Sequence, residues 1–133
     1  MPATLLVIED NAANLELVRF LLSHHGYTVL LARDGPEGVE VALRERPGLI
    51  LCDLQMPGFD GYQVLQKLRG SIDTVVVALT AFSMPNDRHN VLSAGFDGYM
   101  SKPIDPEKFV QEVERYLPES QRAPALNTSA NPR

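Results

Sequence analysis

Four consecutive apolar residues lead directly into an aspartate and a Pro-Gly turn in the stretch Leu49-Ile50-Leu51-Cys52-Asp53-Leu54-Gln55-Met56-Pro57-Gly58. The apolar run does not alternate with polar residues, so it predicts a strand that is buried on both faces. Asp53 therefore stands where a buried strand ends and a loop begins. An aspartate in that position is either a loop residue before a turn or a reactive group, and the rest of the chain bears on the choice.

Four other segments share the apolar character of this strand. The five predicted strands are Thr4–Ile8, Thr28–Ala32, Leu49–Cys52, Val75–Leu79 and Gly98–Met100. Apolar residues at helical spacing separate them, as Leu15, Val18 and Leu22 do after the first strand. Alternating strands and helices predict an α/β fold of five βα units, with a parallel sheet, right-handed crossovers and helices on both faces.

Polar residues follow four of the five predicted strands, and ligands of open parallel sheets bind beyond the carboxyl ends of strands. The second strand ends in Ala32-Arg33, with nothing comparable. This pattern predicts a strand order of 2-1-3-4-5, with a crevice between the first and third strands. The residues concerned are Glu9 and Asp10 after the first strand, Asp53 after the third, Thr80 after the fourth, and Lys102 with Pro103 after the fifth.

Three carboxylates, those of Glu9, Asp10 and Asp53, are expected to converge in this crevice. Carboxylates so close repel one another unless a cation neutralises them, and oxygen ligands of this kind suit Mg²⁺. Lys102 adds an ammonium group and Thr80 a hydroxyl group. Acidic metal ligands, a nucleophilic carboxylate, an ammonium and a hydroxyl form a phosphoryl-transfer set, in which Asp53 attacks phosphorus.

The same residues resemble those of bacterial two-component response-regulator receiver domains. The resemblance rests on residues 8–11 (Ile-Glu-Asp-Asn), 52–58 (Cys-Asp-Leu-Gln-Met-Pro-Gly), 79–81 (Leu-Thr-Ala) and 99–103 (Tyr-Met-Ser-Lys-Pro), and it covers roughly residues 3–117. It implies a flavodoxin-like (βα)5 fold, and an aspartyl phosphate formed on Asp53.

The resemblance also implies the roles of the neighbouring residues. Asp10, Asp53 and the backbone carbonyl of Gln55 would bind Mg²⁺ directly, and Glu9 would bind it mostly through water. Lys102 would pair with Asp53 and then with the phosphoryl group, and the Lys102-Pro103 bond would be cis.

Two further residues are implied to form a switch, and two to tune the lifetime of the phosphorylated state. Thr80 would bind a phosphoryl oxygen and let Tyr99 move inward. Gln55 and Phe82 occupy the tuning positions, and we expect Phe82 to shield the acyl phosphate, so that dephosphorylation is slow to moderate.

The implied partners are a sensor histidine kinase or a histidine phosphotransfer protein as donor, and an effector protein on the face of helix four, strand five and helix five. The expected function is a phosphorylation-switched signal without a DNA-binding output. The protein would not be a conventional enzyme, although it would assist its own Mg²⁺-dependent phosphorylation and dephosphorylation. The sequence leaves the oligomeric state open, a homodimer included.

Two other functions remain as alternatives. A phosphatase with an aspartate nucleophile usually carries a second aspartate two residues later, where this chain has Gln55. A degenerate receiver that only binds partners would lack one of the acidic residues, the acceptor or the lysine. Each of these is present here, so both alternatives are disfavoured.

The bulk properties describe a single soluble domain with a short tail. The chain has 133 residues, which suits one domain. Its net charge of −5 at pH 7 argues against nucleic-acid binding, and its single cysteine excludes an internal disulfide. It has neither a signal-like start nor a membrane-spanning run, so we expect a cytoplasmic protein. Residues 118–133, rich in Pro, Ser and Asn, predict a disordered tail or a linker after a receiver domain over residues 3–117. We expect a stand-alone receiver rather than one excised from a hybrid kinase.

Overall fold

A five-stranded parallel sheet forms the centre of the computed structural model, which describes residues 2–81 and 85–124. The strand order is β2-β1-β3-β4-β5, which confirms the predicted topology. Three strands extend one residue beyond their predicted ends, because the ladder pairs Asp53 with Leu79 and Thr80 with Ser101. The strands are β1 (Thr4–Ile8), β2 (Thr28–Ala32), β3 (Leu49–Asp53), β4 (Val75–Thr80) and β5 (Gly98–Ser101).

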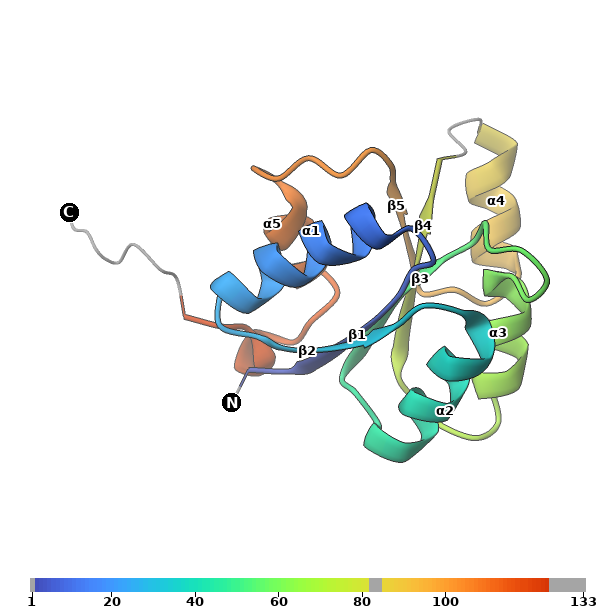
Figure 1. Ribbon diagram of the computed structural model, residues 1–133, viewed down its shortest axis with the longest axis horizontal. Helices are drawn as coiled ribbons and strands as arrows, with labels where there is room; N and C mark the ends of the chain where they lie inside the picture. The colour runs from blue at the N-terminus through green and yellow to red at the C-terminus, as the bar shows by residue number, and fades with distance from the viewer. Residues whose placement is uncertain (1, 82–84, 125–133) are drawn as a thin grey trace.

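Helices cover both faces of the sheet (Figure 1). One apolar core lies under α1 and α5 and includes Val18 and Phe109, and the other lies under α2, α3 and α4 and includes Val64 and Val91. The three inner strands are therefore buried on both sides, as their continuous apolar sequences predict. The helices are α1 (Ala12–His24), α2 (Gly35–Glu45), α3 (Gly61–Leu68), α4 (Pro85–Ser93) and α5 (Phe109–Glu114).

Polar side chains begin the first three helices. Asn11, Asp34 and Asp60 each accept a hydrogen bond from the backbone N–H three residues later, which satisfies a donor that a helix start otherwise leaves unpaired. Because Asn11 caps α1, Asp10 is not needed for capping and its carboxylate faces the sheet edge with Glu9 and Asp53.

Residues 118–124 differ from the disordered tail or linker expected from their composition. They include a short 3-10 helix, η1 (Glu119–Gln121), and Ala123 is buried. The Gln121 carbonyl accepts a hydrogen bond from Ala3 N–H (2.8 Å), and the Tyr27 hydroxyl accepts one from Ala123 N–H (2.9 Å). Long-range partners, rather than local propensity, therefore order this part of the segment; its remaining residues, 125–133, lie outside the described part of the chain.

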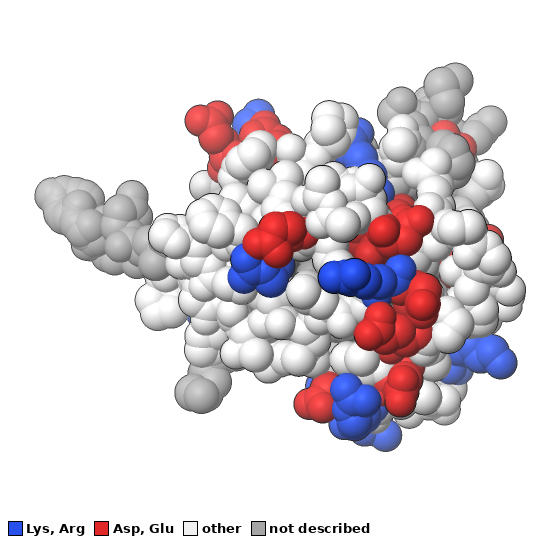
Figure 2. Space-filling model, viewed as in Figure 1, with Lys and Arg blue, Asp and Glu red and all other residues white. Residues whose placement is uncertain are grey.

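The surface carries charges of both signs. On the face drawn in Figure 2, acidic and basic side chains lie interspersed. Among the helices that the structure describes, none combines the length and the apolar character that crossing a bilayer requires.

Candidate functional site

The carboxyl ends of four strands bring the predicted site residues together. The register pairs Ile8 with Cys52, so Glu9 and Asp53 follow at the same level of the neighbouring strands β1 and β3. Thr80 ends β4, and Lys102 comes directly after β5. Glu9, Asp53 and Thr80 are buried. Burial of two neighbouring carboxylates, those of Glu9 and Asp53, is unusual.

The three carboxylates form a compact cluster. Glu9, Asp10 and Asp53 each offer an oxygen within 4.8 Å of the others. Asp10 is exposed, whereas Glu9 and Asp53 are each only 1% exposed. Burial raises the pKa of Glu9 to about 7, and the neighbouring ammonium of Lys102 opposes that rise only in part. The cluster thus holds more negative charge than the protein alone neutralises.

Lys102 lies between the two buried carboxylates. Its Nζ is 2.9 Å from Glu9 Oε1 and 3.2 Å from Asp53 Oδ2. Burial lowers the pKa of Lys102, but the hydrogen bond to Glu9 and the negative charges raise it more, so the ammonium stays charged at neutral pH. The Lys102-Pro103 peptide bond is cis, as the resemblance implied. The Lys102 backbone N–H donates to the Thr80 carbonyl (2.8 Å), which ties the lysine to the end of β4.

A hydrogen bond from the β3–α3 loop orients Asp53. Its Oδ1 accepts the backbone N–H of Gln55 (3.0 Å), while Oδ2 faces Lys102. The loop is held close by Gly61, where a Cβ atom would lie 2.8 Å from the Asp53 carbonyl oxygen. Sequence reasoning missed Gly61 because nothing in its immediate sequence reveals this close approach of α3 to the strand end.

The donor set fits a hard divalent cation. All three clustered side chains supply carboxylate oxygens, the ligand type that Mg²⁺ prefers. Glu9 Oε1 is fully buried and, apart from the ion pair with Lys102, receives no hydrogen bond from the described residues. Lys102 pairs with two of the three carboxylates, which leaves an excess of negative charge that a cation would balance.

The other residues that the sequence predicted for the site are Tyr99, Pro103, Gln55 and Phe82. Tyr99 is partly buried in β5 and packs against the core under α2, α3 and α4, and its backbone N–H donates to the Tyr116 hydroxyl (3.4 Å). Pro103 is exposed, and the Gln55 side chain is exposed beside Asp53. Phe82 lies outside the described residues, so its expected shielding role stays a prediction.

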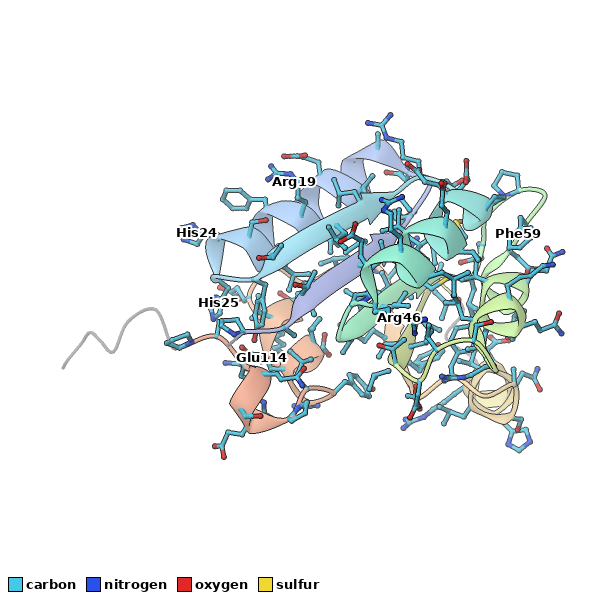
Figure 3. All side chains as sticks on the ribbon, turned by 90° about the horizontal axis from the view of Figure 1, so that it is seen from below. Arg19, His24, His25, Arg46, Phe59 and Glu114 are labelled. Carbon is cyan, nitrogen blue, oxygen red and sulfur yellow. The ribbon has the colours of Figure 1, made fainter. Side chains whose placement is uncertain are left out.

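Two other reactive residue types, cysteine and histidine, stay out of this site. Burial raises the pKa of the Cys52 thiol, which keeps it protonated inside β3. His24 stacks on Phe20, with ring centroids 5.6 Å apart. Figure 3 shows His24 and His25 at the end of the molecule opposite Phe59, which belongs to the β3–α3 loop.

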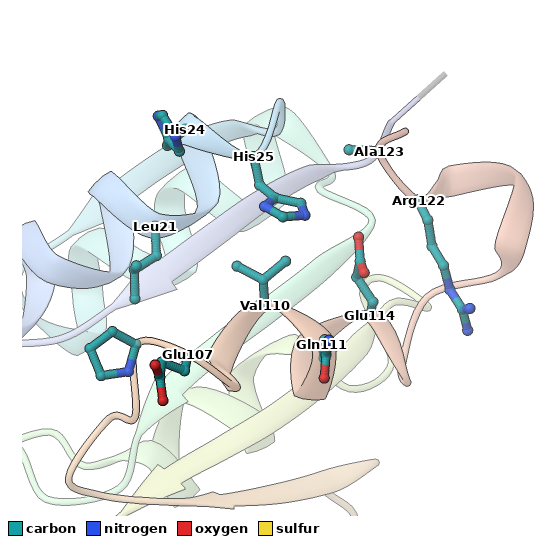
Figure 4. A pocket seen from close by; sticks show the side chains of 10 residues that line it. Leu21, His24, His25, Glu107, Val110, Gln111, Glu114, Arg122 and Ala123 are labelled. Carbon is teal, nitrogen blue, oxygen red and sulfur yellow. The ribbon is translucent and has the colours of Figure 1, made fainter. Parts of the chain in front are cut away.

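A groove of about 550 Å³ lies between α1, α5 and the segment after α5 (Figure 4). His24, His25, Glu107 and Arg122 contribute polar groups to its lining, and Leu21 and Val110 contribute apolar ones. Strand-end residues such as Asp53 and Lys102 do not line it, so it is separate from the carboxylate cluster.

The comparison with known proteins agrees with this geometry. Residues 5–114 match the family described as the response regulator receiver domain. The polar-differentiation response regulator DivK of Brucella anthropi is 35% identical over 120 residues, which cover 88% of this chain and 98% of that protein. The probable transcriptional regulator ycf27 of Porphyridium aerugineum is 37% identical over 127 residues, which cover 96% of this chain but only 53% of the relative.

A solved structure supports the assignment. The receiver domain of the sensor histidine kinase PA1611 from Pseudomonas aeruginosa, described with a magnesium ion coordinated in its active-site cleft, superposes with a TM-score of 0.78 and 32% identity. The match covers 87% of this chain and 98% of that domain. The motifs, the strand order and the carboxylate cluster agree with these matches, and the chain belongs to the response-regulator receiver family.

Proposed function

We propose that this receiver accepts a phosphoryl group on Asp53 from a phosphohistidine of a sensor histidine kinase or a histidine phosphotransfer protein. The observation that carries the proposal is the position of Asp53: a buried carboxylate at a strand end, with Lys102 at 3.2 Å and two further carboxylates beside it. Such a site concentrates electrostatic stabilisation where negative charge moves during phosphoryl transfer.

The transfer exchanges one bond to phosphorus for another. An Asp53 carboxylate oxygen attacks phosphorus, the P–N bond of the phosphohistidine breaks, and the imidazole keeps the electron pair of that bond. The product is an acyl phosphate on Asp53. The Lys102 ammonium, already beside Asp53 Oδ2, pairs with the oxygens of the arriving group. Hydrolysis of the acyl phosphate by water restores the carboxylate and releases inorganic phosphate.

Mg²⁺ would be held by Glu9, Asp10 and Asp53 together with the Gln55 carbonyl. When bound, it supplies positive charge to the carboxylates and to the phosphoryl oxygens. Glu9 is buried, whereas Asp10 is exposed and so remains open to solvent and to an entering ion.

Thr80 and Tyr99 would transmit the phosphorylation of Asp53 to the effector-binding face. Thr80 is buried at the end of β4, next to the acceptor strand, and its hydroxyl is suited to a phosphoryl oxygen. Tyr99 is only partly buried in β5, the edge strand beside α4. A shift of Thr80 toward the phosphoryl group would alter the packing of Tyr99, and with it the α4–β5–α5 face offered to an effector protein.

Phosphorylation is tested by comparing the wild type with Asp53→Asn. The chain is incubated with Mg²⁺ and acetyl phosphate, and separately with a panel of autophosphorylated histidine kinases, and the addition of one phosphoryl group is followed by mass spectrometry. Asp73→Asn, an exposed residue before β4, is the matched control. We expect labelling of the wild type and of Asp73→Asn only; undiminished labelling of Asp53→Asn would refute the proposal.

A further inference from the structure

Gln55 bridges the acceptor aspartate and the neighbouring strand, the first through its backbone and the second through its side chain. Its backbone N–H donates to Asp53 Oδ1 (3.0 Å), and its side-chain Oε1 accepts the backbone N–H of Ala81 (3.0 Å). Gln55 therefore links the carboxylate that receives the phosphoryl group to the first residue after β4.

The Ala81 N–H is open to this contact because the sheet ladder ends just before it. The last rung runs from Leu54 N–H to the Leu79 carbonyl (3.0 Å). In a parallel ladder the next rung would join Ala81 N–H to the Leu54 carbonyl. That carbonyl instead accepts Gly61 N–H (3.2 Å) at the start of α3. The Gln55 carboxamide oxygen takes the place that a strand carbonyl would fill.

We infer that the Gln55 carboxamide holds the Ala81 N–H in the resting state and must release it when a phosphoryl group arrives on Asp53. This inference rests on the proposed function of Asp53. The arriving group brings three acceptor oxygens, which share about two negative charges, to the level of the sheet edge at which Ala81 lies. A hydrogen bond to an anionic oxygen is roughly twice as strong as one to a neutral amide oxygen. Gln55 is thus an internal competitor of the phosphoryl group for one backbone donor.

The competition predicts that loss of the carboxamide contact favours the phosphoryl-bound state. Gln55→Met keeps the length of the side chain and removes the oxygen, whereas Gln55→Asn keeps the amide but shortens its reach. Both variants retain the backbone groups of residue 55. Freeing a donor from one neutral hydrogen bond corresponds to an affinity gain of about fivefold.

The experiment titrates the full chain with beryllofluoride, a phosphoryl mimic, at saturating Mg²⁺ and follows the Ala81 amide by ¹⁵N–¹H NMR. In the metal-free and beryllofluoride-free state, we expect the Ala81 amide to lose its hydrogen-bonded chemical shift in both variants. We then expect both to bind beryllofluoride about fivefold more tightly than the wild type. Gln66→Met, exposed on α3, is the matched control and should titrate like the wild type.

The outcomes separate this inference from the proposed function. If the wild type binds beryllofluoride and both Gln55 variants bind it equally or more weakly, Gln55 is not a competitor and the inference is overturned. If the wild type and the Gln66→Met control show no Mg²⁺-dependent binding, the proposed role of Asp53 fails first. Tighter binding by only one variant also overturns the inference, because both remove the same contact.

Discussion

Lys102 lies closer to Glu9 than to the proposed phosphoryl acceptor: its Nζ is 2.9 Å from Glu9 Oε1, against 3.2 Å from Asp53 Oδ2. The lysine is therefore a structural counter-ion of a buried glutamate as well as a candidate ligand of the phosphoryl group. Removing one partner of a buried ion pair leaves the other charge uncompensated, which is costly.

Replacement of Lys102 is accordingly expected to affect both stability and phosphorylation. Without Mg²⁺, Lys102→Met should lower the free energy of unfolding by about 3 kcal/mol, because Glu9 and Asp53 lose their cation. Urea unfolding at neutral pH measures the change. Lys67→Met, on the exposed side of α3, is the matched control. An equal loss in both variants would show that the buried pairing contributes nothing specific.

The raised pKa of Glu9, about 7, predicts a pH dependence of the metal-free protein. Since the folded state favours the neutral carboxyl, this contribution to stability is complete below the ordinary value of 4.5 and is lost as the pH rises through about 7. Stability should therefore fall between about pH 5 and about pH 8. Thermal unfolding in the presence of a chelator measures it, and Glu9→Gln should flatten the profile.

Addition of Mg²⁺ should oppose this loss. The ion binds carboxylates rather than carboxylic acids, so its stabilising effect should be larger at about pH 8 than at about pH 6. Equal Mg²⁺-induced shifts of the melting temperature at the two pH values would contradict a role for Glu9 in holding the ion.

Tyr27, directly before β2, makes hydrogen bonds to α5 and to the segment after α5. Its buried hydroxyl donates to a Glu114 carboxylate oxygen and accepts Ala123 N–H (2.9 Å). Tyr27→Phe should cost about 1–3 kcal/mol of stability, because it leaves a buried backbone donor unpaired. Chemical unfolding and faster hydrogen exchange at Ala123 test this prediction.

A tyrosine elsewhere in the fold provides the control. The Tyr62 ring packs edge-on against Phe96, and Tyr62→Phe keeps that packing. We expect it to leave the exchange at Ala123 unchanged. Protection of Ala123 that survives in Tyr27→Phe would show that the other contacts of residues 118–124 suffice to hold the segment.

Gly61 is expected to tolerate no side chain. A Cβ atom would lie 2.8 Å from the Asp53 carbonyl oxygen and 2.9 Å from Leu54 Cα, and both are backbone atoms. Gly61→Ala should displace the loop that orients Asp53 and slow phosphorylation by acetyl phosphate about tenfold or more, since small misplacements of reacting groups are costly.

A second glycine separates this effect from general destabilisation. At Gly38 the added Cβ would meet the Ile8 side chain, 2.4 Å away, rather than backbone. Gly38→Ala should reduce stability while leaving the loop around Asp53 in place. Equal rates of phosphorylation in Gly61→Ala and Gly38→Ala would contradict a positioning role for Gly61.

The sequence by itself determined the topology and most of the cluster. Continuous apolar runs marked the strands, and parallel strands carry their carboxyl ends to one edge, so the residues that follow them had to meet there. Glu9, Asp10, Asp53, Thr80 and Lys102 were predictable for that reason, because their positions depend on strand ends and not on details of packing.

Tertiary structure decided what depends on contacts between distant segments. Local composition predicted a disordered tail or a linker over residues 118–133, yet Ala3 and Tyr27 supply partners that hold Gln121 and Ala123. The hydrogen bond from Ala81 N–H to Gln55 Oε1 forms where the Leu54 carbonyl, instead of continuing the ladder, accepts the Gly61 N–H at the start of α3. The pKa of Glu9 likewise follows from burial. None of these features has a local sequence signal, since each depends on which distant groups the fold brings together and which it buries.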